Sequence, residues 1–205
     1  MHARILLYDG FDELDAIAPF EVLANGLKGG EGDVAYVTLE GAREVTGSHG
    51  TVVRADGALD DAATLLVVPG GGWNDRSAQG ARAEAERGAI PRVIADAHQR
   101  GVTIASVCTG GMLVAAAGLL AGRPAVTHHG ALGDLAAAGA QVVQARVVDD
   151  GDILSAGGVT SGIDLALHLV EREFGPAAAE HVAREMEHDR RGPLHRGPGA
   201  GGQTV

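Results

Sequence analysis

The segment 102–117 constrains the fold more than any other part of the chain. Residues 102–105 are apolar and mainly β-branched, which predicts a buried parallel strand, and residues 112–117 favour a helix by propensity. Cys108 is the only cysteine and stands on the turn between them, where Gly110 and Gly111 let neighbouring backbone come close. This order predicts a nucleophile elbow, which holds the cysteine above the edge of a sheet.

The cysteine itself has two interpretations. Most lone cysteines are small buried hydrophobic residues. A cysteine at the start of a helix, however, faces the first N–H groups of that helix and the positive end of its dipole, and both stabilise a thiolate. We therefore expect Cys108 to be a reactive thiol of low pKa.

Predicted strands and helices alternate along the rest of the chain, which indicates an α/β protein with a mostly parallel central sheet. Residues 1–190 form one predicted domain, whereas the Gly- and Pro-rich residues 191–205 have no periodicity and predict a poorly ordered tail. Residues 43–53 and 141–155 predict two hairpin-like excursions. The remaining predicted strands are 3–8, 34–39, 64–68, 102–107 and 124–127, and the predicted helices are 12–27, 79–100, 130–138, 162–174 and 176–188.

The charge balance disfavours two classes of partner. The 205 residues include 27 Asp and Glu against 16 Lys and Arg, a net charge of -11. Sequence-blind binding to nucleic acid or to an anionic membrane needs a basic face, so we expect neither partner. A single cysteine excludes an internal disulfide. Because we also find no secretory signal and no run long enough to span a bilayer, we expect a cytoplasmic protein.

Two further groups are expected at the sheet edge of Cys108, since ligands bind at the carboxyl ends of parallel strands. Gly71 or Gly72, after a buried strand, can offer an N–H group to a developing negative charge; a plain tight turn is the alternative. Asp15 lies in the first turn of the first helix. A carboxyl group facing a thiolate has a raised pKa and can act as general acid and base, although an acid there can also simply complement the helix dipole.

His128 and His129 are weaker candidates for a pocket. Adjacent side chains on an extended segment point in opposite directions, so we expect at most one of the two to face a site. They are equally well explained as residues that open a helix. Two histidines without a second cysteine make a poor metal set, and we expect neither a metal nor another cofactor.

Taken together, the motifs resemble the ThiJ/PfpI superfamily, which includes the Parkinsonism-associated deglycase. Within it, the sequence is similar above all to isocyanide hydratases and to the sensor domains of AraC-type transcription regulators. The similarity runs from Ile5 to about Arg191. It is carried by Leu14-Asp15, Pro19–Leu23, Val68–Gly71, Ser106–Gly110, Ala117–Arg123, Thr127-His128 and Gly157–Asp164.

This resemblance implies a flavodoxin-like three-layer α/β/α sandwich, related to class I glutamine amidotransferases, and a homodimer. It implies a reactive cysteine at Cys108. In the isocyanide hydratase subgroup an aspartate serves as the nearby acid and threonine follows the cysteine, which Asp15 and Thr109 match. The protease-like subgroup has histidine after the cysteine, so Thr109 argues against a Cys-His dyad. His129 replaces a residue that is commonly aromatic in these relatives.

The resulting hypothesis is an enzyme that adds water to an isocyanide and gives an N-substituted formamide. Cys108, Asp15 and Thr109 would be its catalytic residues, and its partner would be a small-molecule substrate. The alternative is a non-enzymatic sensor or stress-response protein whose thiol reacts with electrophiles or oxidants. A glyoxalase- or deglycase-like activity is a third possibility. AraC-type regulators continue into a helix-turn-helix domain, which the Gly/Pro-rich tail does not resemble.

Overall fold

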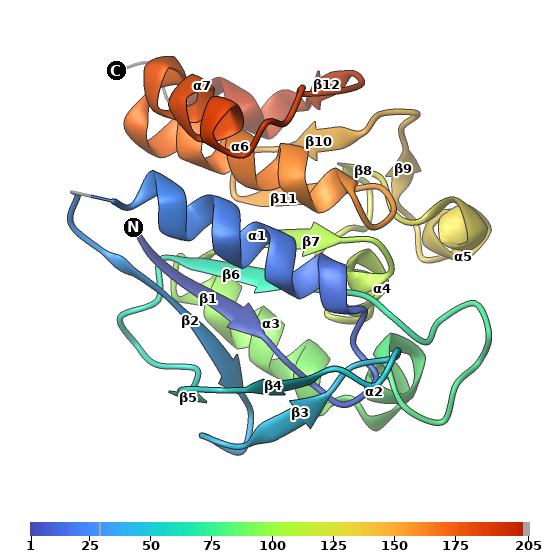
Figure 1. Cartoon of the computed structure of the whole chain (residues 1–205). Helices are drawn as coiled ribbons and strands as arrows, with labels where there is room; N and C mark the ends of the chain where they lie inside the picture. The colour runs from blue at the N-terminus through green and yellow to red at the C-terminus, as the bar shows by residue number, and fades with distance from the viewer. Residues whose placement is uncertain (29, 203–205) are drawn as a thin grey trace.

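A computed structural model describes residues 1–28 and 30–202 (Figure 1). Within these residues, eight strands form one sheet in the spatial order β12-β10-β11-β7-β6-β1-β2-β5. Only β10 and β11 are antiparallel neighbours. The strands are β1 His2–Leu6, β2 Asp33–Thr38, β5 Gly57–Ala58, β6 Leu65–Val68, β7 Thr103–Val107, β10 Val147–Asp149, β11 Ile153–Ala156 and β12 Leu194–Arg196.

Helices cover both faces of this sheet and complete the expected three-layer α/β sandwich. Figure 1 shows α1, α6 and α7 over one face, with α2, α3 and α4 on the other. Because both faces are covered, β6 is buried along its whole length, which explains its uninterrupted apolar sequence. The helices are α1 Glu13–Gly26, α2 Ala81–Arg87, α3 Ala89–Gln99, α4 Gly110–Ala116, α5 Leu132–Ala137, α6 Ser161–Phe174 and α7 Pro176–Glu185.

The smaller elements differ in part from the predicted ones. The first excursion is a hairpin of β3 (Glu44–Thr46) and β4 (Val52–Arg54). The second excursion, predicted for residues 141–155, is divided: β9 (Gln141–Val142) pairs in parallel with β8 (Pro124–Ala125). Its second part, β10, forms the predicted hairpin with β11. Two short 3-10 helices complete the described elements, η1 His129–Ala131 and η2 Pro198–Gly202.

The register of the central strands brings the candidate site together. In the β6–β7 pair, Val68 lies opposite Ser106, so both strands end at the same edge of the sheet. The glycine-rich loop after β6 and the turn at Cys108 are therefore neighbours. The edge at which β7 and β11 begin lies at the opposite end of the sheet.

The expectation of a poorly ordered tail is wrong for residues 194–202, because β12 pairs in parallel with β10. Gly197 N–H donates to Asp149 O at 2.7 Å, and Gly199 N–H donates to Asp150 Oδ1 at 2.9 Å. A Cβ on Gly199 would lie 2.2 Å from Asp150 O, so the glycine is what permits this close contact. A three-residue strand is too short for periodicity to reveal it, and residues 203–205 lie outside the described part.

Within residues 1–28 and 30–202, no helix combines the length and the apolar character that crossing a membrane requires.

Candidate active site

Cys108 sits on a strained turn that its neighbours hold in place. Its φ angle is +56°, the left-handed region that residues other than glycine rarely adopt. Its N–H donates to Gly157 O at 2.9 Å, and its carbonyl accepts a hydrogen bond from Thr127 Oγ1 at 2.6 Å. The backbone is thus fixed from both sides, which is how a fold maintains such a conformation. The predicted strand–turn–helix geometry is present, since β7 ends at Val107 and α4 begins at Gly110.

Two glycines allow the loop after β6 to approach this turn. A Cβ on Gly110 would lie 2.1 Å from Val68 O, and a Cβ on Gly70 would lie 2.5 Å from the Thr109 nitrogen. No larger residue fits either position without moving backbone. These contacts place the Gly70 N–H next to the acid on α1.

Asp15 is that acid, and its carboxyl group is completely buried. Its Oδ2 accepts a hydrogen bond from Gly70 N–H at 2.9 Å. Burial, together with the charge of Asp12, raises the pKa of Asp15 well above its usual range. Its Oδ1 has no hydrogen-bond partner of good geometry among the described residues, although the nearby Cys108 thiol lowers the Asp15 pKa somewhat.

Asp12, and not Asp15, caps α1, although Asp15 also lies in the first turn of that helix. Asp12 is the N-cap residue of α1, and its side chain accepts a hydrogen bond from Leu14 N–H at 3.2 Å. Asp15 therefore does not cap the helix. A buried acid without a cation or a complete set of hydrogen bonds is costly, and this makes Asp15 a candidate for chemistry.

The expected low pKa of Cys108 is not what the structure gives. Burial of the thiol and the negative charge of Asp15 raise its pKa to about 12. The N–H groups of Val159 and Thr109 oppose this by donating to the sulfur, but they are the weaker effect. The contribution of Asp15 disappears when its carboxyl is protonated. The raised pKa values of both groups favour their neutral forms, a thiol beside a carboxylic acid.

The glycine loop offers fewer free donors than expected. Gly71 N–H donates to Thr109 Oγ1 at 2.9 Å, so Gly71 is not available to an oxyanion in this geometry. Gly70 N–H is likewise occupied, by Asp15. Gly72 N–H makes no hydrogen bond to any residue that the structure describes, and it stays a predicted donor. Thr109 is buried and has two contacts here, its hydroxyl to the loop and its N–H to the sulfur.

Sequence reasoning missed two residues at this edge. Val159, in the loop after β11, donates its N–H to the sulfur and has a φ of +41°. Tyr8, just after β1, donates its hydroxyl to Pro69 O at 2.6 Å and so supports the glycine loop. Both residues follow strands that end at the edge of the sheet where Cys108 lies. That position in the sequence is the feature from which their place at the site could have been predicted.

His128 and His129 do not point in opposite directions. Their rings pack together with centroids 4.1 Å apart, because the chain turns into η1 here instead of continuing extended. His128 Nδ1 accepts a hydrogen bond from Gly130 N–H at 3.1 Å and contacts Asn74 Nδ2 at 3.0 Å. Burial and the neighbouring His129 lower the pKa of His128, so it is neutral. His129 is exposed. Among the described residues, no group of three His, Cys, Asp or Glu side chains could hold a metal ion.

A cavity of about 440 Å³ opens beside this constellation. Val159 connects the two, because its N–H contacts the sulfur and the residue also lines the cavity. Leu14 adds an apolar wall. The lining residues are Asp12, Glu13, Leu14, His49, Thr51 and Val159.

These features define a class of α/β sandwich proteins with a single-cysteine site. They are the mostly parallel sheet, the cysteine on a strained elbow and the buried acid from the first helix. The model of the DJ-1/PfpI family matches residues 1–172, and the chain belongs to this family.

Similar proteins include enzymes of two activities. The chain is 34% identical over 196 residues to the isonitrile hydratase of Pseudomonas putida, covering 94% of this chain and 80% of that protein. It is 32% identical over 159 residues to a deglycase of Thermococcus kodakarensis, covering 76% and 89%. Among solved structures, a ThiJ/PfpI family protein from Pseudomonas syringae superposes with a TM-score of 0.81 at 28% identity, covering 94% of this chain and 76% of that chain.

Proposed function

We propose that the protein is a cysteine-dependent isocyanide hydratase, a hydro-lyase that converts an isocyanide and water into an N-substituted formamide. The observation that carries this proposal is the buried Asp15 carboxyl, which has one oxygen fixed by Gly70 N–H and the other without a partner beside Cys108. The similarity to an isonitrile hydratase supports the same choice.

The first step adds the thiol to the isocyanide. Asp15 donates a proton to the terminal carbon, the Cys108 sulfur forms a bond to that carbon, and the thiol proton passes to Asp15. The product is a thioimidate, R–N=CH–S–Cys108, and Asp15 is again a carboxylic acid. The raised pKa values of both groups favour a neutral thiol and a neutral acid, and these forms suit this exchange.

The second step releases the product. Water adds to the thioimidate carbon, while Asp15 relays a proton to the nitrogen. The C–S bond then breaks, the hydroxyl proton returns to sulfur, and R–NH–CHO leaves. The N–H groups of Thr109 and Gly72 would donate to the reacting atoms. The apolar walls from Leu14 and Val159 suit the substituent R.

The neutral thiol weakens the sensor alternative. Oxidation to sulfenic and sulfinic acid starts from the thiolate, and burial of Cys108 together with the Asp15 charge disfavours that form. A deglycase activity stays a second candidate, because deglycases are among the similar proteins.

The test is turnover of a simple aryl isocyanide by the purified protein, with formamide measured by chromatography. Methylglyoxal consumption is measured in parallel. We expect formamide production that Cys108→Ala abolishes. Consumption of methylglyoxal without formamide production would assign a deglycase activity to the site. If neither compound is turned over, the non-enzymatic sensor is the hypothesis that agrees with the result.

We also propose a homodimer. Val52 is a large apolar side chain that stays 55% exposed, and a second copy would cover it. Sedimentation at micromolar concentration should show a dimer, and Val52→Glu should shift it toward monomer. Arg92→Glu, on the exposed face of α3, is the control and should leave the dimer intact.

A further inference from the structure

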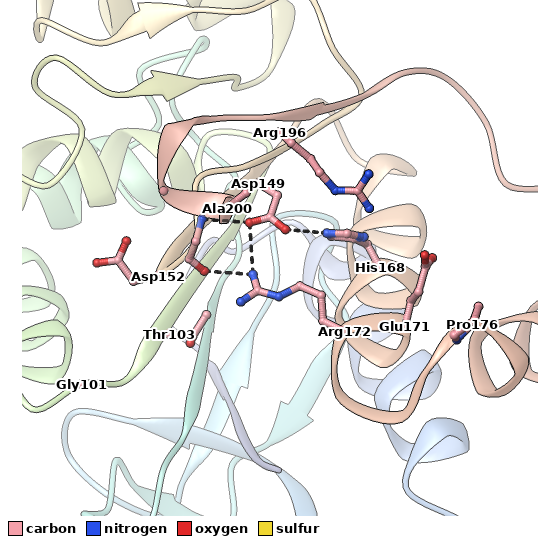
Figure 2. Close-up of a pocket in the computed structure, with 12 residues that line it drawn as sticks. Gly101, Thr103, Asp149, Asp152, His168, Glu171, Arg172, Pro176, Arg196 and Ala200 are labelled. Atoms are coloured by element: carbon pink, nitrogen blue, oxygen red, sulfur yellow. Dashed lines mark hydrogen bonds and ion pairs between the residues drawn. The ribbon is translucent and has the colours of Figure 1, made fainter. Parts of the chain in front are cut away.

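A second cavity, of about 660 Å³, lies at the opposite edge of the sheet from Cys108 (Figure 2). It is enclosed by the start of β7, the turn between β10 and β11, the second half of α6, and the tail after β12. It shares no lining residue with the cavity beside Cys108. Its size is within the range of small-molecule pockets, roughly 300–1,000 Å³.

Arg172 of α6 is a fixed cation in this pocket. Its Nη1 donates to Asp149 Oδ1 at 3.1 Å and to Gly151 O at 2.9 Å. Neither its Nε nor its Nη2 donates to any residue in the described part of the chain. The guanidinium is thus held in position while its Nε and Nη2 donors are still available. The Arg172 side chain therefore loses little conformational entropy when a ligand binds.

Arg196, at the end of β12, is the second cation. It is exposed, and its side chain forms no ion pair or hydrogen bond with a residue of the described ranges. Figure 2 shows its guanidinium extending over the same pocket, on the side of His168. The C-terminal segment, which the sequence predicts to be poorly ordered, therefore places Arg196 at this cavity.

The carboxylates in the lining already have partners. Asp149 interacts with His168 at 2.7 Å as well as with Arg172. Asp152 interacts with His98 at 2.6 Å and with Arg123, and Glu171 interacts with Arg190 at 2.5 Å. Arg196 is the charged lining residue whose side chain has no partner among the described residues, so it is the group that can bind an anionic ligand.

We propose that this cavity binds a small phosphate monoester, with the phosphoryl group held between Arg172 and Arg196. A tetrahedral dianion presents three free oxygens and can accept hydrogen bonds from two separate walls. A carboxylate has two oxygens in one plane, which a single guanidinium fork already satisfies. The volume beyond the phosphoryl group would hold the organic part of the ester.

The proposal is tested by calorimetric titration of the full chain with phenyl phosphate at constant ionic strength, with benzoate as the matched planar anion. We expect saturable binding of phenyl phosphate and binding of benzoate at least about tenfold weaker. Arg196→Gln should weaken phenyl phosphate binding by about tenfold or more, since one charge-assisted contact is lost. Arg92→Gln removes an exposed arginine from α3 and should leave the affinity unchanged.

The location is tested with two further measurements. Cys108→Ala should bind phenyl phosphate as the parent does, and Arg196→Gln should keep the parent's isocyanide turnover. The proposal is overturned by absence of saturable binding, by equal affinity for benzoate, by parent-like affinity in Arg196→Gln, or by loss of binding in Cys108→Ala. The binding outcomes do not depend on whether the hydratase assignment is correct, and only the turnover measurement on Arg196→Gln requires an active hydratase.

Discussion

Asp15 and Asp149 are both buried carboxyl groups, at opposite edges of one sheet, and their surroundings differ completely. Asp149 accepts hydrogen bonds from His168, Arg172 and Gly151 N–H, and its pKa is lowered because these contacts outweigh burial. Asp15 has one hydrogen bond, from Gly70, and burial raises its pKa. Burial alone therefore does not mark a reactive acid. What distinguishes Asp15 is that, among the described residues, no cation pairs with its buried carboxyl group.

The largest expected effect comes from removing Asp15 and Cys108. Cys108→Ala should abolish isocyanide hydration, and Asp15→Ala should reduce its rate at least about a hundredfold, the lower end for a positioned general acid. The double variant should be no worse than Cys108→Ala, because no adduct is left to protonate. Steady-state formamide production measures this.

Glu21→Ala is the matched control, since Glu21 is an exposed acid on the same helix. It should keep the parent rate. Parent-like turnover by Asp15→Ala would show that Asp15 is no more than a structural acid, and His128 would be the next general acid to test.

Removing Asp149 should affect stability instead of activity. Asp149→Ala leaves His168 and Arg172 without their carboxylate, and breaking such a buried pair costs about 3 kcal/mol of unfolding free energy. Denaturant titration measures this loss. Asp61→Ala, an acid that is 99% exposed, should change the unfolding free energy by less than about 0.5 kcal/mol. A small change in unfolding free energy for Asp149→Ala would contradict the structural role assigned to the cluster of Asp149, His168 and Arg172.

The docked tail provides a smaller test at the same edge of the sheet. Gly199→Ala should lower the unfolding free energy by about 1–2 kcal/mol, because the new methyl group displaces Asp150 and loosens the contact. Gly133→Ala is the control, since a Cβ there meets nothing within 4 Å, and it should be neutral or slightly stabilising. If both variants have the parent's stability, the tail is not docked as described.

The sequence predicted the elbow and Asp15 better than the interactions around them. Strand, cysteine, glycines and helix are contiguous, so local pattern sufficed for Cys108. The place of Asp15 in the first turn of the first helix follows from the sequence, whereas its complete burial does not. The assignment of Asp15 as the acid depends on its hydrogen bond from Gly70 N–H, a residue that lies 55 positions away in the chain.

What could not be predicted depends on distant segments. The raised thiol pKa results from burial and from Asp15, a residue of another element. The Asp149 cluster joins β10 to α6, and the sequence displayed only an acidic turn there. The tail docks through backbone N–H groups of Gly197 and Gly199, which no side-chain pattern encodes.

The pH dependence of the unfolding free energy should have opposite signs for the two acids. Asp15 has a raised folded-state pKa, so the folded state binds more protons than the unfolded chain above about pH 4, and stability is lost as pH rises. Asp149 has a lowered folded-state pKa, so its stabilisation is present above about pH 4 and is lost as pH falls through its folded-state pKa. Each group can contribute a slope of at most about 1.4 kcal/mol per pH unit.

Denaturant titrations of parent, Asp15→Asn and Asp149→Asn between pH 3 and pH 7 separate the two contributions. Relative to the parent, Asp15→Asn should gain stability as pH rises from 4 to 7, because the variant has no carboxyl to ionise in the buried site. Asp149→Asn should be destabilised at pH 7, and its deficit should shrink toward pH 3, where the parent begins to lose the same ion pair. Difference curves of the same sign would mean that the two buried acids are electrostatically equivalent, and the distinction between a reactive and a structural carboxyl would fail.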